Sequence, residues 1–249
     1  MALHHFWSGV RRQMMKRRPS LISRSGPYRK GRLSLRSLAI LAAAAIAVLL
    51  LLEGIKNFSD DPRRSEKAAA ADLMKTAIQA IKAERERLGI PRNPMIDPGS
   101  TGLIGEAYND LTTTTGSLAS KRTSTNPQFA AVVVGMLEEA GVRAGDAVAV
   151  SFSGSFPALN IAVLSAVFAM KLRPVIISSV GASMYGANLP ELTWLDMERI
   201  LSEKGVLPYR SIAASLGGIA DTRGGLDGTG VDAGLRAIRR NGIPQLDEA

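Results

Sequence analysis

The sequence predicts an α/β protein, with a single N-terminal transmembrane helix followed by a Rossmann-like three-layer domain that has a mainly parallel sheet. Three observations predict this class. An uninterrupted apolar segment follows a strongly basic N-terminus. Helix-like and strand-like segments then alternate, which is typical of parallel strands joined by crossover helices. Each strand-like segment ends in a loop rich in glycine and serine, and open α/β sheets bind their ligands at the edge where such loops meet.

The apolar segment extends from Leu38 to Leu52 without a polar residue. With residues 33–37 it provides about 20 residues, enough for one bilayer crossing. Residues 1–36 contain basic side chains and no Asp or Glu, and Glu53 is the first acid. The positive-inside rule therefore predicts a single-pass inner membrane protein with a cytoplasmic N-terminus and an extracytoplasmic C-terminal domain. The alternative is a cleaved signal peptide, although no small-x-small cleavage site follows the segment.

Composition divides the chain into four predicted parts. We expect a basic cytoplasmic tail at 1–36, a transmembrane helix at 37–56, a linker and stalk helix at 57–98, and an α/β domain at 99–249. The tail contains ten of the 31 Lys and Arg residues and none of the 22 Asp and Glu residues, so the rest of the chain is close to neutral. The excess positive charge is therefore expected to lie against a membrane surface rather than to bind nucleic acid.

The predicted elements follow from apolar runs and from the glycine and proline residues that interrupt them. The predicted helices are 65–88, 127–140, 157–171, 192–204 and 231–241. The predicted strands are 147–151, 174–179 and 209–216. The first of these helices is either a stalk or the first helix of the domain. Asn126 is predicted to cap the second helix, with Pro127 at its first position.

The residue types that are missing limit the chemistry. There is no cysteine, and both histidines lie in the first five residues. A thiol nucleophile, a disulfide and, in the folded part, a Ser-His-Asp triad or a histidine-rich metal site are therefore excluded. No pair of carboxylates has a spacing typical of a metal site, so we expect neither a metal nor a cofactor. Catalysis would have to use carboxylates, Lys, Tyr, Ser or Thr.

The loops nevertheless offer many hydrogen-bond donors. Hydroxyls, amides, basic side chains and the free N–H groups at helix starts can all bind a carboxylate or a phosphate. The candidate ligand-binding residues are Lys121, Arg122, Ser153, Ser155, Asn160, Ser179, Ser183, Asn188 and Arg223. For each loop taken alone, the simpler interpretation is an ordinary turn or a capped helix start.

Several motifs resemble the bacterial poly-γ-glutamate system protein family. They are Gly102-Leu-Ile-Gly105, Thr114-Thr-Gly-Ser-Leu118, Lys121-Arg-Thr-Ser-Thr-Asn-Pro127, Ser153-Gly-Ser-Phe-Pro-Ala-Leu-Asn160, Val175-Ile-Ile-Ser-Ser179 and Thr193-Trp-Leu-Asp-Met-Glu-Arg-Ile200. The resemblance covers most of the C-terminal part and implies a cell-envelope or capsule system that makes or exports poly-γ-glutamate, an anionic polymer. It implies no set of catalytic residues. The family pattern Ser-Leu-Gly-Ala-Ser, with a tryptophan nearby, is replaced here by Ser179-Val-Gly-Ala-Ser-Met-Tyr185.

Two functions are compatible with this resemblance. The first is an accessory or polymer-binding subunit, whose partners are other poly-γ-glutamate synthesis or export membrane proteins and whose ligand is the anionic polymer or a glutamyl group. The second is an amide hydrolase or transferase that acts on the polymer or on its glutamyl ends. A buried lysine can act as a base for a serine nucleophile. The candidate catalytic residues are Lys121, Ser153, Ser155, Tyr185 and Asp196.

Overall fold

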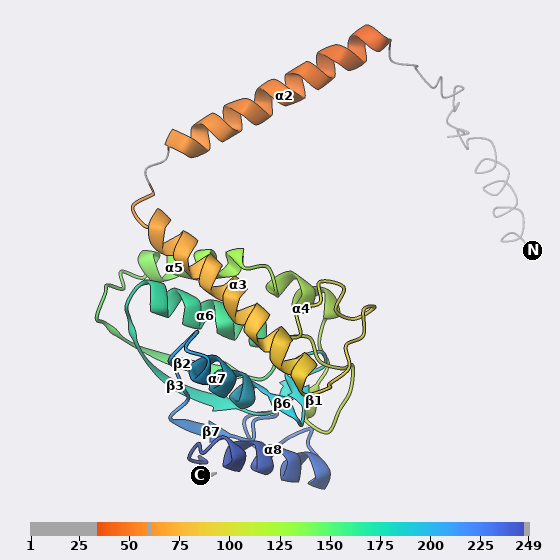
Figure 1. The fold of residues 1–249 in the computed structure, drawn as a ribbon, viewed down its shortest axis with the longest axis vertical. Coiled ribbons are helices and arrows are strands. Elements are labelled where there is room, and N and C mark those ends of the chain that lie inside the picture. The colour runs from red at the N-terminus through yellow and green to blue at the C-terminus, as the bar shows by residue number, and fades with distance from the viewer. Residues whose placement is uncertain (1–33, 59–60, 247–249) are drawn as a thin grey trace, which may run out of the picture. The chain divides into compact units, whose positions relative to one another are not determined.

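A computed structural model describes residues 34–58 and 61–246 (Figure 1). The chain divides into two compact units, with the boundary after Ser59. Apart from residues 34–36, the predicted basic tail lies outside the described residues.

The first unit contains helix α2, Leu35–Phe58. Within it, residues Leu35–Leu52 are apolar enough and numerous enough to cross a membrane, and none of them is buried. Among the described residues, α2 is the one helix with this property. A signal sequence near an N-terminus has the same length and composition. The predicted apolar helix is therefore confirmed as a structural element.

The second unit is a mixed α/β body. Its elements in chain order are α3 (Arg64–Arg87), β1 (Thr112–Thr114), α4 (Leu118–Ser124), α5 (Gln128–Glu139), β2 (Ala147–Ser153), α6 (Pro157–Ala169), β3 (Arg173–Ser179), β4 (Ala182–Ser183), β5 (Asn188–Leu189), β6 (Leu192–Thr193), α7 (Trp194–Glu203), β7 (Ala213–Ser215) and α8 (Gly228–Arg240). The predicted α/β class with mainly parallel pairing is confirmed.

The main sheet has the strand order β2-β3-β7, and both pairs are parallel. Helix α6 connects β2 to β3, and α7 lies between β3 and β7 in the chain. The register aligns the last residues of the three strands, Ser153, Ser179 and Ser215. Two smaller sheets accompany it, a parallel β1–β4 pair and an antiparallel β5–β6 pair. This arrangement brings the loops after the three strands to one edge.

The helices that pack on this sheet cover one of its faces. Phe152 and Ile176 are buried on that face, and the Phe152 ring meets Trp194 of α7 edge-on at 5.4 Å. The next residues along β3 alternate to the other face, where Val175 and Ile177 are 49% and 40% exposed. The three-layer arrangement therefore stays a prediction, because the described helices supply a layer for one face.

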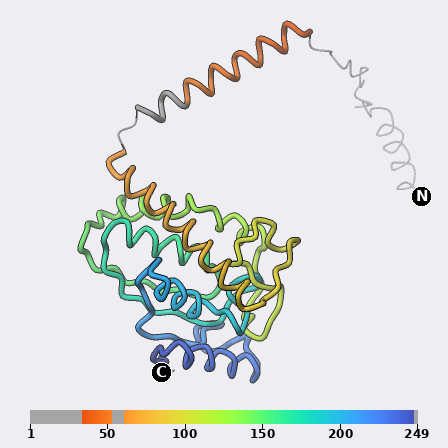
Figure 2. Tube along the Cα trace, in the orientation of Figure 1, coloured from red at the N-terminus to blue at the C-terminus, as the bar shows by residue number. Residues whose placement is uncertain are grey.

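Helix α3 belongs to the core of the body. Its buried residues Ala70, Met74, Ala77 and Ile81 recur at helical spacing and form a stripe. The helix packs against α5 and α6, as Figures 1 and 2 show. Of the two roles that the sequence left open for this segment, the structure shows the first helix of the domain.

Several predicted boundaries moved. Helix α5 begins at Gln128, and its N-cap residue is Pro127 rather than the predicted Asn126. The Asn126 side chain still accepts a hydrogen bond from the Gln128 N–H (3.0 Å). The strand predicted at 209–216 is shortened to β7, because the Ser211 N–H donates to the Glu198 carboxylate (3.0 Å) instead of to a neighbouring strand. Helix α4 was not predicted.

Candidate functional site

The aligned ends of β2, β3 and β7 border a cavity of about 370 Å³. Its lining includes serines from all three strands and the glycine pair after β7. These residues are Ser151, Ser153, Ser178, Ser179, Ser215, Gly217 and Gly218. We name this cavity the sheet-edge cavity. It lies where ligand sites occur in open parallel sheets.

Two hydroxyls of this cavity are available to a ligand. In residues 61–246, the Ser151 and Ser179 hydroxyls have no hydrogen-bond partner. By contrast, the Ser153 hydroxyl accepts from the Ser155 N–H (3.2 Å), and the Ser215 hydroxyl donates to Asp221 (2.6 Å). The cavity therefore presents two free donors beside an exposed carboxylate.

Glycine is required on one side of the cavity. Gly217 has a positive φ of 76°, and a Cβ there would approach the Ser179 Cβ to 2.8 Å. Any side chain at this position would both strain the backbone and collide with the end of β3. The loop after β7 therefore lies close against the strand end, which keeps its backbone beside the Ser179 hydroxyl.

A second group of predicted residues meets around Lys121 of α4. The Lys121 Nζ donates to the Ser183 hydroxyl (2.7 Å) and to the Ser155 carbonyl oxygen, and it lies 3.6 Å from the centre of the Phe156 ring. The Ser155 hydroxyl accepts from the Ser183 N–H (3.1 Å). Burial lowers the pKa of Lys121 to about 8. We name Lys121, Ser155 and Ser183 the lysine cluster.

The lysine cluster is closed to solvent. Lys121 is 3% exposed and Ser183 6% exposed. The contacts of the ammonium group with Ser155, Ser183 and the Phe156 ring tie the loop after β2 and the strand β4 to α4. A lysine with this pKa can accept a proton from a serine, but a substrate would reach Ser183 only after a local rearrangement.

The remaining predicted residues hold loops in place. Arg122 donates to the Met95 and Ile96 carbonyl oxygens, and Asn160 donates to the Ser153 carbonyl oxygen (2.9 Å). Asn188 pairs with both the N–H and the C=O of Glu106. The backbone N–H of Arg223 donates to the Gly217 carbonyl oxygen (2.8 Å).

The nine candidate residues thus do not line one cavity. Ser153 and Ser179 lie in the sheet-edge cavity, and Lys121, Ser155 and Ser183 form the lysine cluster. Asp196, a candidate in the catalytic alternative, completes the capping box of α7 with Thr193 and forms an ion pair with Arg240. Tyr185 adopts a positive φ of 63° in the loop after β4.

Sequence reasoning missed Ser151 and Ser215 of the sheet-edge cavity. A signal for both was present. Ser151 ends the predicted strand 147–151 and precedes the candidate Ser153 by two residues, so a strand that continues to Ser153 places the two side chains on one face. Ser215 lies near the end of the predicted strand 209–216 and so belongs to the same edge.

The described residues contain no group of three or more His, Asp or Glu side chains that could hold a metal ion. Comparisons with protein-family models, with curated proteins and with solved structures found no match to this chain.

Proposed function

We propose that this chain is a membrane-anchored component of a poly-γ-glutamate synthesis or export system and that it acts as an accessory, polymer-binding subunit. The sequence resemblance, the apolar helix α2 and the near-neutral body support this proposal. In it, α2 crosses the inner membrane once and the body is extracytoplasmic, beside the membrane proteins that make and export the polymer. The Rossmann-like three-layer arrangement belongs to the proposal and requires a layer over the face that carries Val175 and Ile177.

The observation that carries the binding role is the pair of free hydroxyls in the sheet-edge cavity. Ser151 and Ser179 present donors without partners, and a glutamyl carboxylate is an acceptor that two neighbouring hydroxyls can bind. A contact of this kind already exists at this edge, because the Ser215 hydroxyl donates a hydrogen bond to the Asp221 carboxylate. Asp221 also repels an anionic ligand and is expected to limit its affinity.

Isothermal titration of the detergent-solubilised full chain with γ-linked glutamate oligomers tests this role. The double variant Ser151→Ala/Ser179→Ala is expected to weaken binding about tenfold, since two hydrogen bonds to a charged group are lost. Asp221→Asn is expected to strengthen binding by about twofold to fivefold, because one repulsive charge is removed. Ser120→Ala, at an exposed position of α4, is the matched control. Absence of binding, or an unchanged affinity in the double variant, would remove the proposal.

The membrane arrangement is tested separately. A reporter that is active only outside the cytoplasm is fused to the C-terminus of the full chain and is expected to be active. Retention of the intact chain in the membrane fraction distinguishes an anchor from a cleaved signal sequence. Co-purification of polymer-synthesis proteins from the same detergent extract is expected. A cytoplasmic C-terminus would exclude the proposed arrangement.

One observation favours the catalytic alternative. The Lys121 Nζ lies 2.7 Å from the Ser183 hydroxyl oxygen, and burial lowers the pKa of this lysine to about 8. In this alternative Lys121 takes the Ser183 proton while the oxygen attacks a γ-amide carbonyl, and the proton then passes to the leaving amine. Water hydrolyses the resulting ester. Shortening of purified poly-γ-glutamate by the wild type, but not by Ser183→Ala, would establish it, and unchanged polymer length would exclude it.

A further inference from the structure

A second cavity, of about 480 Å³, lies between the C-terminal end of α3 and the loop residues 91–108. Its lining contains several charged or polar side chains and the apolar Ile96 and Ile104. The polar ones are Arg85, Arg92, Asn93, Asp97, Glu106 and Tyr108. We name it the Arg85 cavity. It shares no residue with the sheet-edge cavity, and its volume is typical of a small-molecule site.

Arg85 is a buried cation without a counter-ion in contact. It is 4% exposed. Its Nη1 donates to the Gly102 (3.2 Å) and Ile104 (2.8 Å) carbonyl oxygens, and its Nη2 donates to the Pro91 carbonyl oxygen (2.8 Å). Among the described residues its Nε has no hydrogen-bond partner, and no carboxylate oxygen lies within ion-pair distance. Since arginine stays protonated, the Nε donor remains unsatisfied, and Asp97 and Glu106 act on the charge from beyond contact distance.

The nearby charges limit which anion could compensate Arg85. The Asp97 carboxylate is occupied by its own loop, accepting from Thr101 and from the Gly102 N–H (2.8 Å). Arg92 is paired with Glu86 (2.9 Å), and Glu106 is exposed. Two acids and two bases thus line the cavity, which disfavours a doubly charged ligand such as phosphate. A single carboxylate is the better match in charge.

We propose that the Arg85 cavity binds a small carboxylate, with one carboxylate oxygen accepting a hydrogen bond from the Arg85 Nε. Because this atom is itself buried, the ligand reaches it after a local shift of the loop 91–104. The exposed Asn93 amide and the Arg92 guanidinium provide further donors at the cavity lining. The apolar side chains of Ile96 and Ile104 contact the carbon chain of the ligand. This inference does not depend on the polymer proposal, because the two cavities share no residue.

A purely structural role for Arg85 explains less. Its three bonds to carbonyl oxygens tie the loop 91–104 to α3, and a structural arginine needs no more than that. Such a role leaves the free Nε and the unpaired charge unexplained, and both are costly in a buried position. A structural role also predicts that carboxylates have no specific effect on the protein.

The test is calorimetric titration of the detergent-solubilised full chain with sodium acetate, sodium butyrate and sodium phosphate, in a sodium chloride background of matched ionic strength. Acetate and butyrate, which each carry one carboxylate, are expected to bind in the millimolar range or tighter and to raise the melting temperature. Phosphate is expected to bind more weakly. Tighter phosphate binding would overturn the assignment to a carboxylate, and absence of acetate and butyrate binding would overturn the site.

Variants locate the binding. Arg85→Lys retains a charge but lacks the Nε donor, and it is expected to weaken butyrate binding at least about tenfold. If that variant fails to fold, Arg92→Gln/Asn93→Ala decides the question, with an expected loss of about threefold to tenfold. Arg143→Gln, at an exposed position before β2, is the matched control. Ser151→Ala/Ser179→Ala should leave butyrate affinity at the Arg85 cavity unchanged. Equal affinity in the wild type, Arg85→Lys and Arg92→Gln/Asn93→Ala would refute the proposal.

Discussion

Lys121 and Arg85 are both buried cations, but they relieve the cost of burial differently. The lysine can lose its proton, and burial lowers its pKa to about 8. The arginine cannot do so within the stable pH range of a protein. A buried lysine therefore couples stability to pH, whereas a buried arginine requires a compensating charge. This difference is the reason for assigning a ligand to the Arg85 cavity and a pH dependence to the lysine cluster.

The first prediction concerns Lys121. Because its pKa is about 8 when folded and 10.5 for the ordinary side chain, the unfolded chain binds the additional proton between these values. The free energy of unfolding therefore rises with pH across this window, by up to about 2 kcal/mol between pH 7.5 and 9.5. Lys121→Met should remove this increase, and Lys75→Met, at an exposed position of α3, should retain it. Urea denaturation at several pH values measures the slopes, and parallel slopes for wild type and Lys121→Met would contradict the prediction.

At the scale of elements, β3 has one covered and one open face. Ile176 and Ile177 are neighbours in sequence, but Ile176 is 1% exposed and Ile177 is 40% exposed. Parallel sheets are usually covered on both faces, so the exposure of Ile177 is unusual for this class. The two residues offer a matched pair for measuring what each face contributes.

Ile176→Ala is expected to lower the free energy of unfolding by about 2–4 kcal/mol, because it leaves a cavity in the core. Ile177→Ala removes a side chain that is already partly in water, so its expected cost is about 1 kcal/mol or less. Chemical denaturation of both variants in the same buffer tests the difference. Similar costs for the two would mean that the face bearing Ile177 is covered in the purified protein.

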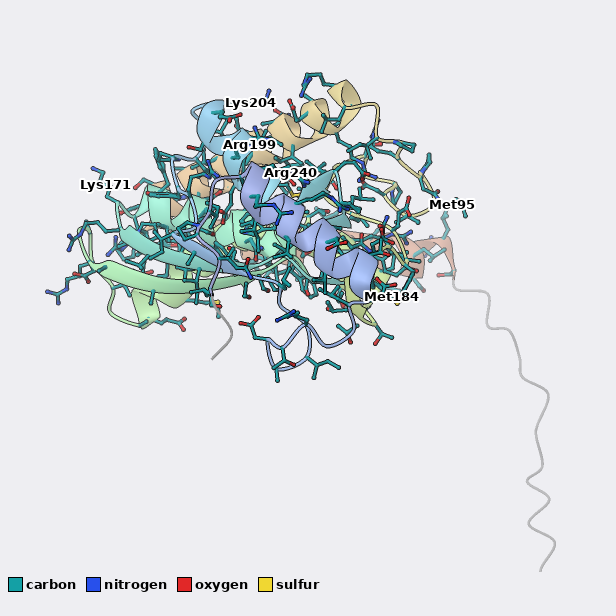
Figure 3. The ribbon with its side chains drawn as sticks, turned by 90° about the horizontal axis from the view of Figure 1, so that it is seen from below. Met95, Lys171, Met184, Arg199, Lys204 and Arg240 are labelled. Carbon is teal, nitrogen blue, oxygen red and sulfur yellow. The ribbon has the colours of Figure 1, made fainter. Side chains whose placement is uncertain are left out.

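The start of α7 is secured by a buried carboxylate. Asp196 accepts from the Thr193 N–H and hydroxyl (both 2.7 Å), from the Asn241 amide (2.8 Å) and from the Arg240 Nε (2.7 Å). Figure 3 shows Arg240 on α8 and Arg199 on α7 near one another. Burial alone raises the pKa of Asp196. The hydrogen bonds from Arg240, Thr193 and Asn241 outweigh this effect and hold the pKa below its ordinary value. Asp196 therefore joins two helices in addition to capping one.

Asp196→Asn should destabilise the protein by about 2–3 kcal/mol, because it leaves Arg240 without its partner and replaces an acceptor by a donor. Glu203→Gln on the same helix also breaks an ion pair with an arginine, Arg199, but that pair is exposed. Its expected cost is below about 0.5 kcal/mol. Thermal and urea denaturation compare the two, and equal losses would show that Asp196 adds nothing beyond a surface pair.

At the scale of the whole molecule, the sequence predicted what depends on local pattern. The main helices and strands follow from apolar periodicity and from glycine and proline positions, and the ends of β2 and β3 were placed close to where they lie. The sequence could not predict the burial of Arg85, because α3 is rich in charge and this position is covered by a loop 17 to 19 residues away. The sequence likewise could not predict which face of β3 is covered, because this depends on where helices distant in the sequence pack.

The loop that covers Arg85 and the turn after α6 lie at different ends of the body. Figure 3 shows Met95 of that loop and Lys171 of the turn on opposite sides of the view. The buried apolar residues of the body form two clusters, and the residues of both lie between Ala70 and Ile238. All the buried apolar residues that hold these distant regions together therefore belong to the second unit.

A chain that begins at residue 60 should accordingly fold without α2. The reason is that the buried apolar residues of the body all belong to the second unit, and that no described side chain of Leu35–Leu52 is buried. The truncated body is expected to purify without detergent and to melt cooperatively within about 2 °C of the full chain in micelles, because a change of less than about 0.5 kcal/mol shifts the melting temperature by no more than this. Circular dichroism measures both transitions, with Ile176→Ala in each background as a control for sensitivity. A non-cooperative transition in the truncated body, together with a cooperative one in the full chain, would show that residues 1–59 contribute to folding of the α/β body as well as to its attachment.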